Sequence, residues 1–155
     1  AAARGAGHGE AIGAEGALLD PDAATPAPPI PNGDYRCRVI KVGAKSISLL
    51  DYVAYPYFQC RVAPEGSLQK LAKLTGSQRH VWLVFPGDAL RQVFLGTLVL
   101  GDETRAMAYG ADRDRNVAGF VERIGPARWR MVMPYPHFES RLDVMELVPV
   151  SNGER

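Results

Sequence analysis

Beyond residue 33, apolar and polar residues alternate in short runs that turn residues separate. Alternation is clearest near the C-terminal end, where Trp129, Met131 and Met133 share one face of a run and Arg128 and Arg130 share the other. "PGD" at 86–88, "GDE" at 101–103 and "IGPAR" at 124–128 predict tight turns. The pattern predicts eight strands, at 35–42, 57–62, 80–85, 91–100, 105–109, 117–124, 127–133 and 142–148.

One run has the spacing of a helix instead. In 67–76, leucines recur at every third position, Ser67 suits the N-cap and Gly76 suits the C-terminal end. We therefore expect one short helix here, packed as a lid against the sheet. Because no strand–helix–strand rhythm appears, the strands are expected to be antiparallel. The sequence predicts a mainly β fold, a small antiparallel barrel of about eight strands, with a sandwich as the alternative; closure favours the barrel because it removes exposed edges.

The first 33 residues differ from the rest. Residues 1–16 hold five glycines, which weaken a helix expected around 10–18, and 20–34 hold five prolines. The prolines predict an extended connector along the domain surface, or a docking peptide for another protein. The predicted organisation is an N-terminal arm at 1–33, one β domain at 34–150 and a tail at 151–155. Since the chain begins without Met, we expect it to follow a cleavage site or to lie within a longer product.

The two cysteines, Cys37 and Cys60, occur in similar phrases, "YRCRV" and "FQCRV". In each phrase, alternation places the cysteine on the apolar face of its strand. If the strands are neighbours, the sulfurs come within bonding distance, and a disulfide in an oxidising compartment is the preferred interpretation. Two buried free thiols are the alternative. A reactive thiol is the third, and no nearby His or Lys supports it.

Composition is that of an ordinary globular domain, and charge excludes one class of partner. Hydrophobic residues make up 46% of the 155 residues, and 18 basic and 17 acidic side chains give a net charge of +1. This balance excludes nucleic acid as a partner, and the apolar run at 93–101 is too short for a transmembrane span. Polar strand faces carry arginines that form a basic patch if their strands are adjacent, blunted by Glu122 and Glu146. These arginines are Arg36, Arg38, Arg61, Arg128 and Arg130.

Catalytic and metal-binding signatures are absent from the sequence. His8, His80 and His137 lie far apart, and neither a CxxC nor an HxxxH spacing occurs, so no metal site or cofactor is expected. The chain also has no G-x-S-x-G elbow and no phosphate-binding G-x-x-x-x-G-K. We therefore assign no catalytic residues, and enzymatic activity is not the favoured interpretation.

A polar cluster lies at 133–143, where Pro134 and Pro136 stiffen the chain. A rigid loop with aromatic, imidazole and charged groups suits recognition of a ligand or partner. A corner connection between strands is the structural interpretation, and acid–base catalysis is the third. The candidate recognition residues are Tyr135, His137, Glu139 and Arg141, with Asp143 at the end of the cluster.

Several phrases resemble a family of uncharacterised bacterial proteins. They include "GALLDPDA", "GDYRCRVIK", "LDYVAYPYFQCRV", "KLTGSQR", "FLGTLVLG", "GFVERIGPARWRMVMPYP" and "LDVMELVP", within about residues 10–150. The family is a domain of unknown function found mainly in alphaproteobacteria and usually predicted to be exported or lipid-anchored. The resemblance implies an extracytoplasmic location, in the periplasm or anchored facing it, with a possible lipid anchor upstream. It implies no activity.

Three functional hypotheses follow. The first is a cell-envelope binding or interaction module for an unknown protein or a small apolar ligand, by fold analogy with lipocalin-like carriers. A barrel filled by its own side chains favours protein binding, whereas a large interior cavity favours a small ligand. The second is a periplasmic hydrolase that uses the 133–143 loop. The third is a structural envelope protein that docks through its N-terminal arm.

Overall fold

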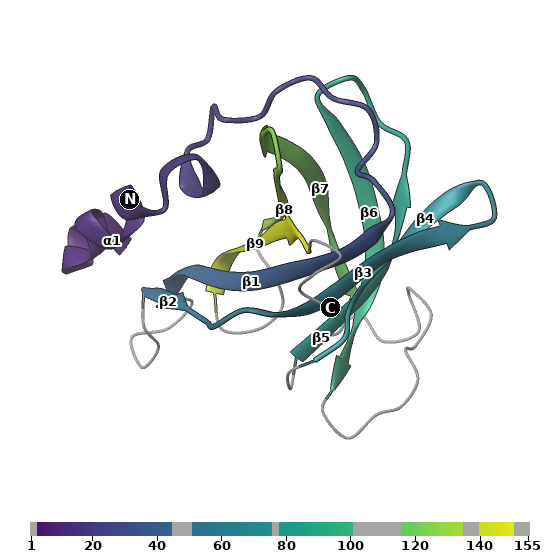
Figure 1. Cartoon of the computed structure of the whole chain (residues 1–155). Coiled ribbons are helices and arrows are strands. Elements are labelled where there is room, and N and C mark those ends of the chain that lie inside the picture. The colour runs from purple at the N-terminus through teal and green to yellow at the C-terminus, as the bar shows by residue number, and fades with distance from the viewer. Residues whose placement is uncertain (1–2, 45–50, 76–77, 101–115, 135–139, 151–155) are drawn as a thin grey trace.

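The computed structural model describes residues 3–44, 51–75, 78–100, 116–134 and 140–150. Within them, an N-terminal arm precedes nine antiparallel strands of one sheet (Figure 1). The strands are β1 (Gly33–Ala44), β2 (Tyr52–Ala54), β3 (Phe58–Glu65), β4 (Leu68–Lys73), β5 (Gln78–Phe85), β6 (Arg91–Leu100), β7 (Asn116–Gly125), β8 (Arg128–Pro134) and β9 (Ser140–Pro149).

The sheet closes into a barrel because β1 pairs with both β3 and β9. Its first residues pair with β3, where Tyr35 lies opposite Cys60, and nearly its whole length pairs with β9 from Tyr35↔Pro149 to Ala44↔Ser140. Every strand from β3 to β9 pairs with the next, which gives eight strands in the closed wall. The ninth, β2, is an additional strand on the second half of β1. The predicted antiparallel barrel is therefore confirmed.

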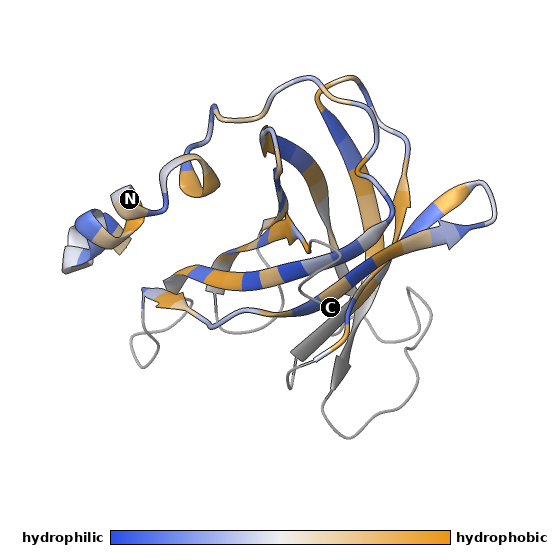
Figure 2. Ribbon diagram, viewed as in Figure 1, coloured by the Kyte–Doolittle hydropathy of each residue, from blue (hydrophilic) through white to orange (hydrophobic). Residues whose placement is uncertain are grey.

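Alternate residues of the strands in the closed wall face the interior, as the pattern along the first half of β1 illustrates (Figure 2). Trp82 and Phe94 lie at the centre with ring centroids 5.0 Å apart. Gly96 pairs with Trp82, and a Cβ at Gly96 would lie 2.1 Å from the Trp82 Cβ, so only glycine leaves room for this indole. The other fully buried members of this core include Leu71, Val62, Val84, Met131, Met133, Met145 and Leu147.

The helix predicted at 67–76 is wrong, because these residues form β4. Glu65 pairs with Leu68 across a two-residue turn in which Gly66 has φ 59°, a conformation that glycine adopts without strain. Leu71 and Lys73 face the interior, while Leu74 is exposed. A helix here would leave the backbone groups of β3 and β5 unpaired, and this requirement outweighs the weak preference of a leucine repeat.

The other predicted strands lie where the structure has strands, except that 105–109 falls outside the described residues. β2 was not predicted. It is three residues long, and Pro56 ends the regular pairing before β3 begins. The helix expected around 10–18 is divided between the short helix α1 (Gly9–Ala14) and a 3₁₀ turn η2 (Gly16–Leu19), and a π-type turn η1 (Arg4–His8) precedes them.

The N-terminal arm docks on the outside of its own barrel. Leu18 is fully buried against Ile40, Ile124 and Val144 from three different strands. The guanidinium of Arg130 donates hydrogen bonds to the backbone carbonyls of residues 17, 18 and 20, at 3.1, 3.1 and 2.6 Å. Three carbonyls held by one buried arginine fix the course of the arm, which then crosses the barrel mouth (Figure 1).

Ile30 closes that mouth. It is 1% exposed and packs within the interior core. Its N–H donates to the Gln92 side chain at 2.9 Å, and its carbonyl accepts from the Gln69 amide at 2.6 Å. Gln92 in turn donates to Gln69 at 3.0 Å. These contacts hold the end of the proline-rich segment against the barrel.

Candidate functional site

Cys37 and Cys60 form a disulfide, with Cα atoms 6.0 Å apart. Their strands are neighbours, and both cysteines face the interior and are at most 1% exposed. The favoured interpretation of the repeated phrase is confirmed. Buried disulfides are typical of proteins that fold in oxidising compartments, so this bond indicates a non-cytoplasmic protein.

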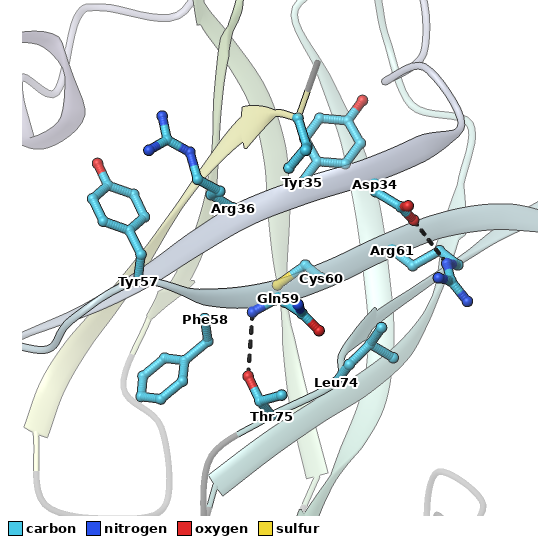
Figure 3. Close-up of a pocket in the computed structure, with 11 residues that line it drawn as sticks. Asp34, Tyr35, Arg36, Tyr57, Phe58, Gln59, Cys60, Arg61, Leu74 and Thr75 are labelled. Carbon is cyan, nitrogen blue, oxygen red and sulfur yellow. Dashed lines mark hydrogen bonds and ion pairs between the residues drawn. The ribbon is translucent and has the colours of Figure 1, made fainter. Parts of the chain in front are cut away.

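A groove of about 820 Å³ lies over this junction of β1 and β3 (Figure 3). Tyr57 and Arg36 stand side by side at one end, and the Asp34–Arg61 ion pair lies at the other, with N and O 2.8 Å apart. Leu74 and Thr75, which follow β4, form one wall, and the Thr75 hydroxyl accepts a hydrogen bond from the Gln59 N–H at 3.2 Å. The lining residues are Asp34, Tyr35, Arg36, Tyr57, Phe58, Gln59, Cys60, Arg61, Leu74, Thr75 and Val150.

Local strand geometry creates this groove. The backbone of β3 is held on both sides, by β1 and by β4, but Pro56 cannot donate to the ladder, and the chain at 55–57 departs from β3 toward β2. Tyr57 therefore leaves the sheet and reaches over β1. Its hydroxyl donates to Glu146, and the guanidinium carbons of Arg36 and Arg38 each lie 5.2 Å from its ring centroid.

The groove combines exposed apolar surface with hydrogen-bonding and charged groups. Tyr57 is 43% exposed and Leu74 is 39% exposed, which are high fractions for large apolar side chains. Burial of part of the phenol, together with the hydrogen bond to Glu146, raises the pKa of Tyr57 above its ordinary value, so the hydroxyl stays protonated. Such a surface can bind a chain segment or ligand that offers both apolar and polar atoms.

The predicted arginine patch is largely neutralised on the barrel surface. Glu122 and Glu146 are buried and each pairs with two arginines, so both carboxylates act as the sequence predicted. Within the described part of the chain, Arg36 differs because it has no carboxylate partner. The pairs are Arg38 with Glu15 and Glu146, Arg61 with Asp34, Arg128 with Glu146, Arg130 with Glu122, and Arg91 with Glu122.

Among the described residues, three charged side chains lie inside the barrel at the end opposite Ile30, those of Lys41, Lys73 and Asp143. The Nζ of Lys41 is 3.4 Å from the Oδ2 of Asp143. The Nζ of Lys73 lies 4.3 Å from the Phe58 ring centroid. Burial, reinforced by the charge of Lys41, lowers the pKa of Lys73 to about 8, so part of this amine is neutral in mildly alkaline solution. Asp143 is the residue of the 133–143 cluster whose side chain the structure places, and it faces the interior.

The predicted recognition residues Tyr135, His137 and Glu139 lie outside the described residues. Arg141 belongs to β9, and its side chain is also outside what the structure describes. Sequence reasoning missed the groove, although the aromatic-rich phrase "DYVAYPYF" marked the place where β2 gives way to β3. The described residues contain no group of three His, Cys, Asp or Glu side chains that could hold a metal ion. None of their helices is long and apolar enough to span a membrane.

Comparison with known proteins places the chain in a family. No curated protein and no solved structure matches it significantly. A family described as a domain of unknown function, DUF4893, matches residues 1–147, which include the arm and nearly all of the barrel. The chain therefore belongs to the DUF4893 family.

Proposed function

We propose that this protein is an interaction module of the cell envelope that binds a partner through the groove over β1 and β3, without catalysing a reaction. The observation that carries the proposal is the groove itself, about 820 Å³ with exposed Tyr57 and Leu74 beside charged groups. Its location in the periplasm, or anchored facing it, is part of the proposal. The Cys37–Cys60 disulfide supports that location because such bonds persist in oxidising compartments.

The barrel interior favours a partner on the outside over a ligand within. Trp82, Phe94 and Met131 occupy the centre of the barrel, and Ile30 closes one mouth. A carrier for a small apolar ligand needs an interior space of several hundred Å³. The side chains of the described core instead fill the interior, so we place the binding surface on the outside of the barrel.

The arm also supports this choice. Leu18 and Ile30 are its most buried large apolar residues, and both pack on the chain's own barrel. Docking to a neighbouring protein through these two residues would require undocking them first. Hydrophobic burial of the pair is worth about 3–6 kcal/mol, which opposes such an exchange.

The test is differential capture from a periplasmic extract. The bait is the oxidised full chain, as wild type, as Leu74→Arg and as Leu83→Arg. Leu83 is the matched control, since it is 37% exposed on β5 against 39% for Leu74 but does not line the groove. We expect one set of proteins to be captured by wild type and Leu83→Arg and lost with Leu74→Arg. If all three baits capture the same set, the groove is not the binding surface and the proposal is wrong.

A further inference from the structure

One arginine of the predicted patch has no carboxylate partner among the described residues, and it stands at the end of the groove. Arg38, Arg61, Arg128 and Arg130 each pair with an aspartate or glutamate of this chain. Among the described residues, Arg36 does not, although it comes from the same strand as Arg38. Carboxylates of this chain already pair with the other arginines of the patch. A carboxylate from another molecule therefore meets the least competition at Arg36.

The Tyr57 ring also restrains the side chain of Arg36. Its guanidinium carbon lies 5.2 Å from the centroid of the Tyr57 ring, and Arg38 lies at the same distance from that ring. Tyr57 itself is held by its hydrogen bond to Glu146, a buried carboxylate that also pairs with Arg128 and Arg38. Stacking on a held ring limits the rotamers of Arg36, so less entropy is lost when its fork of N–H donors binds a carboxylate.

The remaining groove residues restrict where a second positive site could form. At the other end, the guanidinium of Arg61 is paired with Asp34 at 2.8 Å. Gln59 pairs with Arg36 across the strands, and Leu74 follows on the other side of Gln59, where its N–H donates to the Gln59 carbonyl at 2.8 Å. These two residues offer the groove an amide and an apolar contact. The groove therefore presents a cationic end next to an apolar wall, and its complement is an acidic group next to an apolar one.

We propose that the groove binds an extended segment of a partner protein in which an aspartate or glutamate lies beside a bulky apolar residue, with Arg36 binding the carboxylate and Leu74 contacting the apolar side chain. This inference rests on the proposed function and specifies its partner. A segment of polypeptide fits a groove of about 820 Å³ that is lined from β1, β3 and the residues after β4. Arg36 thereby decides which sequences bind, because a charge-assisted bidentate contact has strict geometry.

The experiment selects peptides from a random displayed library on the oxidised full chain. Individual peptides are then measured against Arg36→Glu, Arg36→Lys, Lys70→Glu and Leu74→Arg. Lys70 is the matched control because it is exposed on β4 outside the groove, and its replacement changes the net charge equally. We expect selected peptides to be enriched in an acidic residue beside an apolar one. Their affinity should fall at least tenfold with Arg36→Glu, fall less with Arg36→Lys, and stay unchanged with Lys70→Glu.

The outcomes separate this inference from the proposed function. If Leu74→Arg abolishes binding while Arg36→Glu does not change it, the groove binds peptides but the acidic requirement is wrong. If neither variant affects the selected peptides, both proposals are wrong. If sodium phenylacetate, a free carboxylate with an apolar ring, binds as tightly as the peptides and with the same dependence on Arg36, the occupant is a small organic anion and the polypeptide assignment is overturned.

Discussion

Removal of the Cys37–Cys60 disulfide should lower the stability of the barrel substantially. The bond closes a loop with a sequence separation of 23 residues between two adjacent strands. On the chain-entropy relation, a loop of this length restricts the unfolded chain by about 3 kcal/mol at 25 °C. For a domain of this size, that loss corresponds to a fall in Tm of about 6–12 °C.

The assay is urea unfolding followed by the fluorescence of the two tryptophans. Three samples are compared: the oxidised wild type, the wild type unfolded and refolded with excess dithiothreitol, and the Cys37→Ala/Cys60→Ala double variant. We expect both samples without the bond to unfold at lower urea, with a larger m-value for the denatured chain that is no longer cross-linked. Agreement between reduced wild type and double variant separates loss of the bond from loss of the sulfur atoms.

The reasoning is refuted if the oxidised and reduced wild type unfold at the same urea concentration. Such a result would mean that the segment joining the two cysteines is already confined in the unfolded state. A shift in the double variant without a shift on reduction would assign the effect to packing, because both sulfurs are buried in the core.

Three further predictions concern packing and charge inside the barrel. Ile30→Ala should cost about 2–5 kcal/mol in chemical denaturation, since it empties the closed mouth, whereas Pro28→Ala on the exposed side of the same segment should cost much less. Equal losses of stability for the two variants would contradict the role of Ile30 in closing the barrel mouth. Gly96→Ala should destabilise the fold by at least about 1–3 kcal/mol, because the added Cβ would lie 2.3 Å from the Val81 carbonyl oxygen. A neutral effect in a thermal melt would show that β5 and β6 have room for this Cβ. The pKa of Lys73 is lowered to about 8 from 10.5, so between these pH values the unfolded chain binds more protons than the folded one, and stability should rise with pH. Lys73→Met should flatten this rise in urea midpoints measured at pH 7–11. An unchanged slope in the variant would assign the pH dependence to other groups.

The barrel could be predicted from the sequence because most of its strands have one face in the core. The predicted alternation is reproduced: Trp129, Met131 and Met133 are buried inside, while Arg128 and Arg130 lie on the outer face, where the arm covers Arg130. The segment at 67–76 was misread because its leucines lie three apart, a spacing that fits a helix locally. In the closed sheet, β3 and β5 need a strand between them to pair with. This requirement depends on the whole sheet and is not visible in the local sequence pattern.

The candidate site was less accessible to sequence reasoning. Its lining comes from β1, from β3 and from the residues after β4, and their proximity depends on strand pairing. The sequence did identify Arg36 as a member of a basic set and Glu146 as a carboxylate that would blunt it. It could not tell which arginine of the patch would lack a partner. Arg36 and Arg38 lie on the same face of β1, and they differ in their partners on β9, which are Val148 for Arg36 and Glu146 for Arg38.

The pairing of β1 with β9 has a consequence for biosynthesis. Lys41 and Asp143, 102 residues apart in sequence, meet across this seam, and the partner of Tyr35 is Pro149. During synthesis, one edge of β1 therefore stays unpaired until β9 has been made. Any product truncated before 140 would expose the edges of both β1 and β8, which is the kind of surface that quality-control proteases and aggregation act upon.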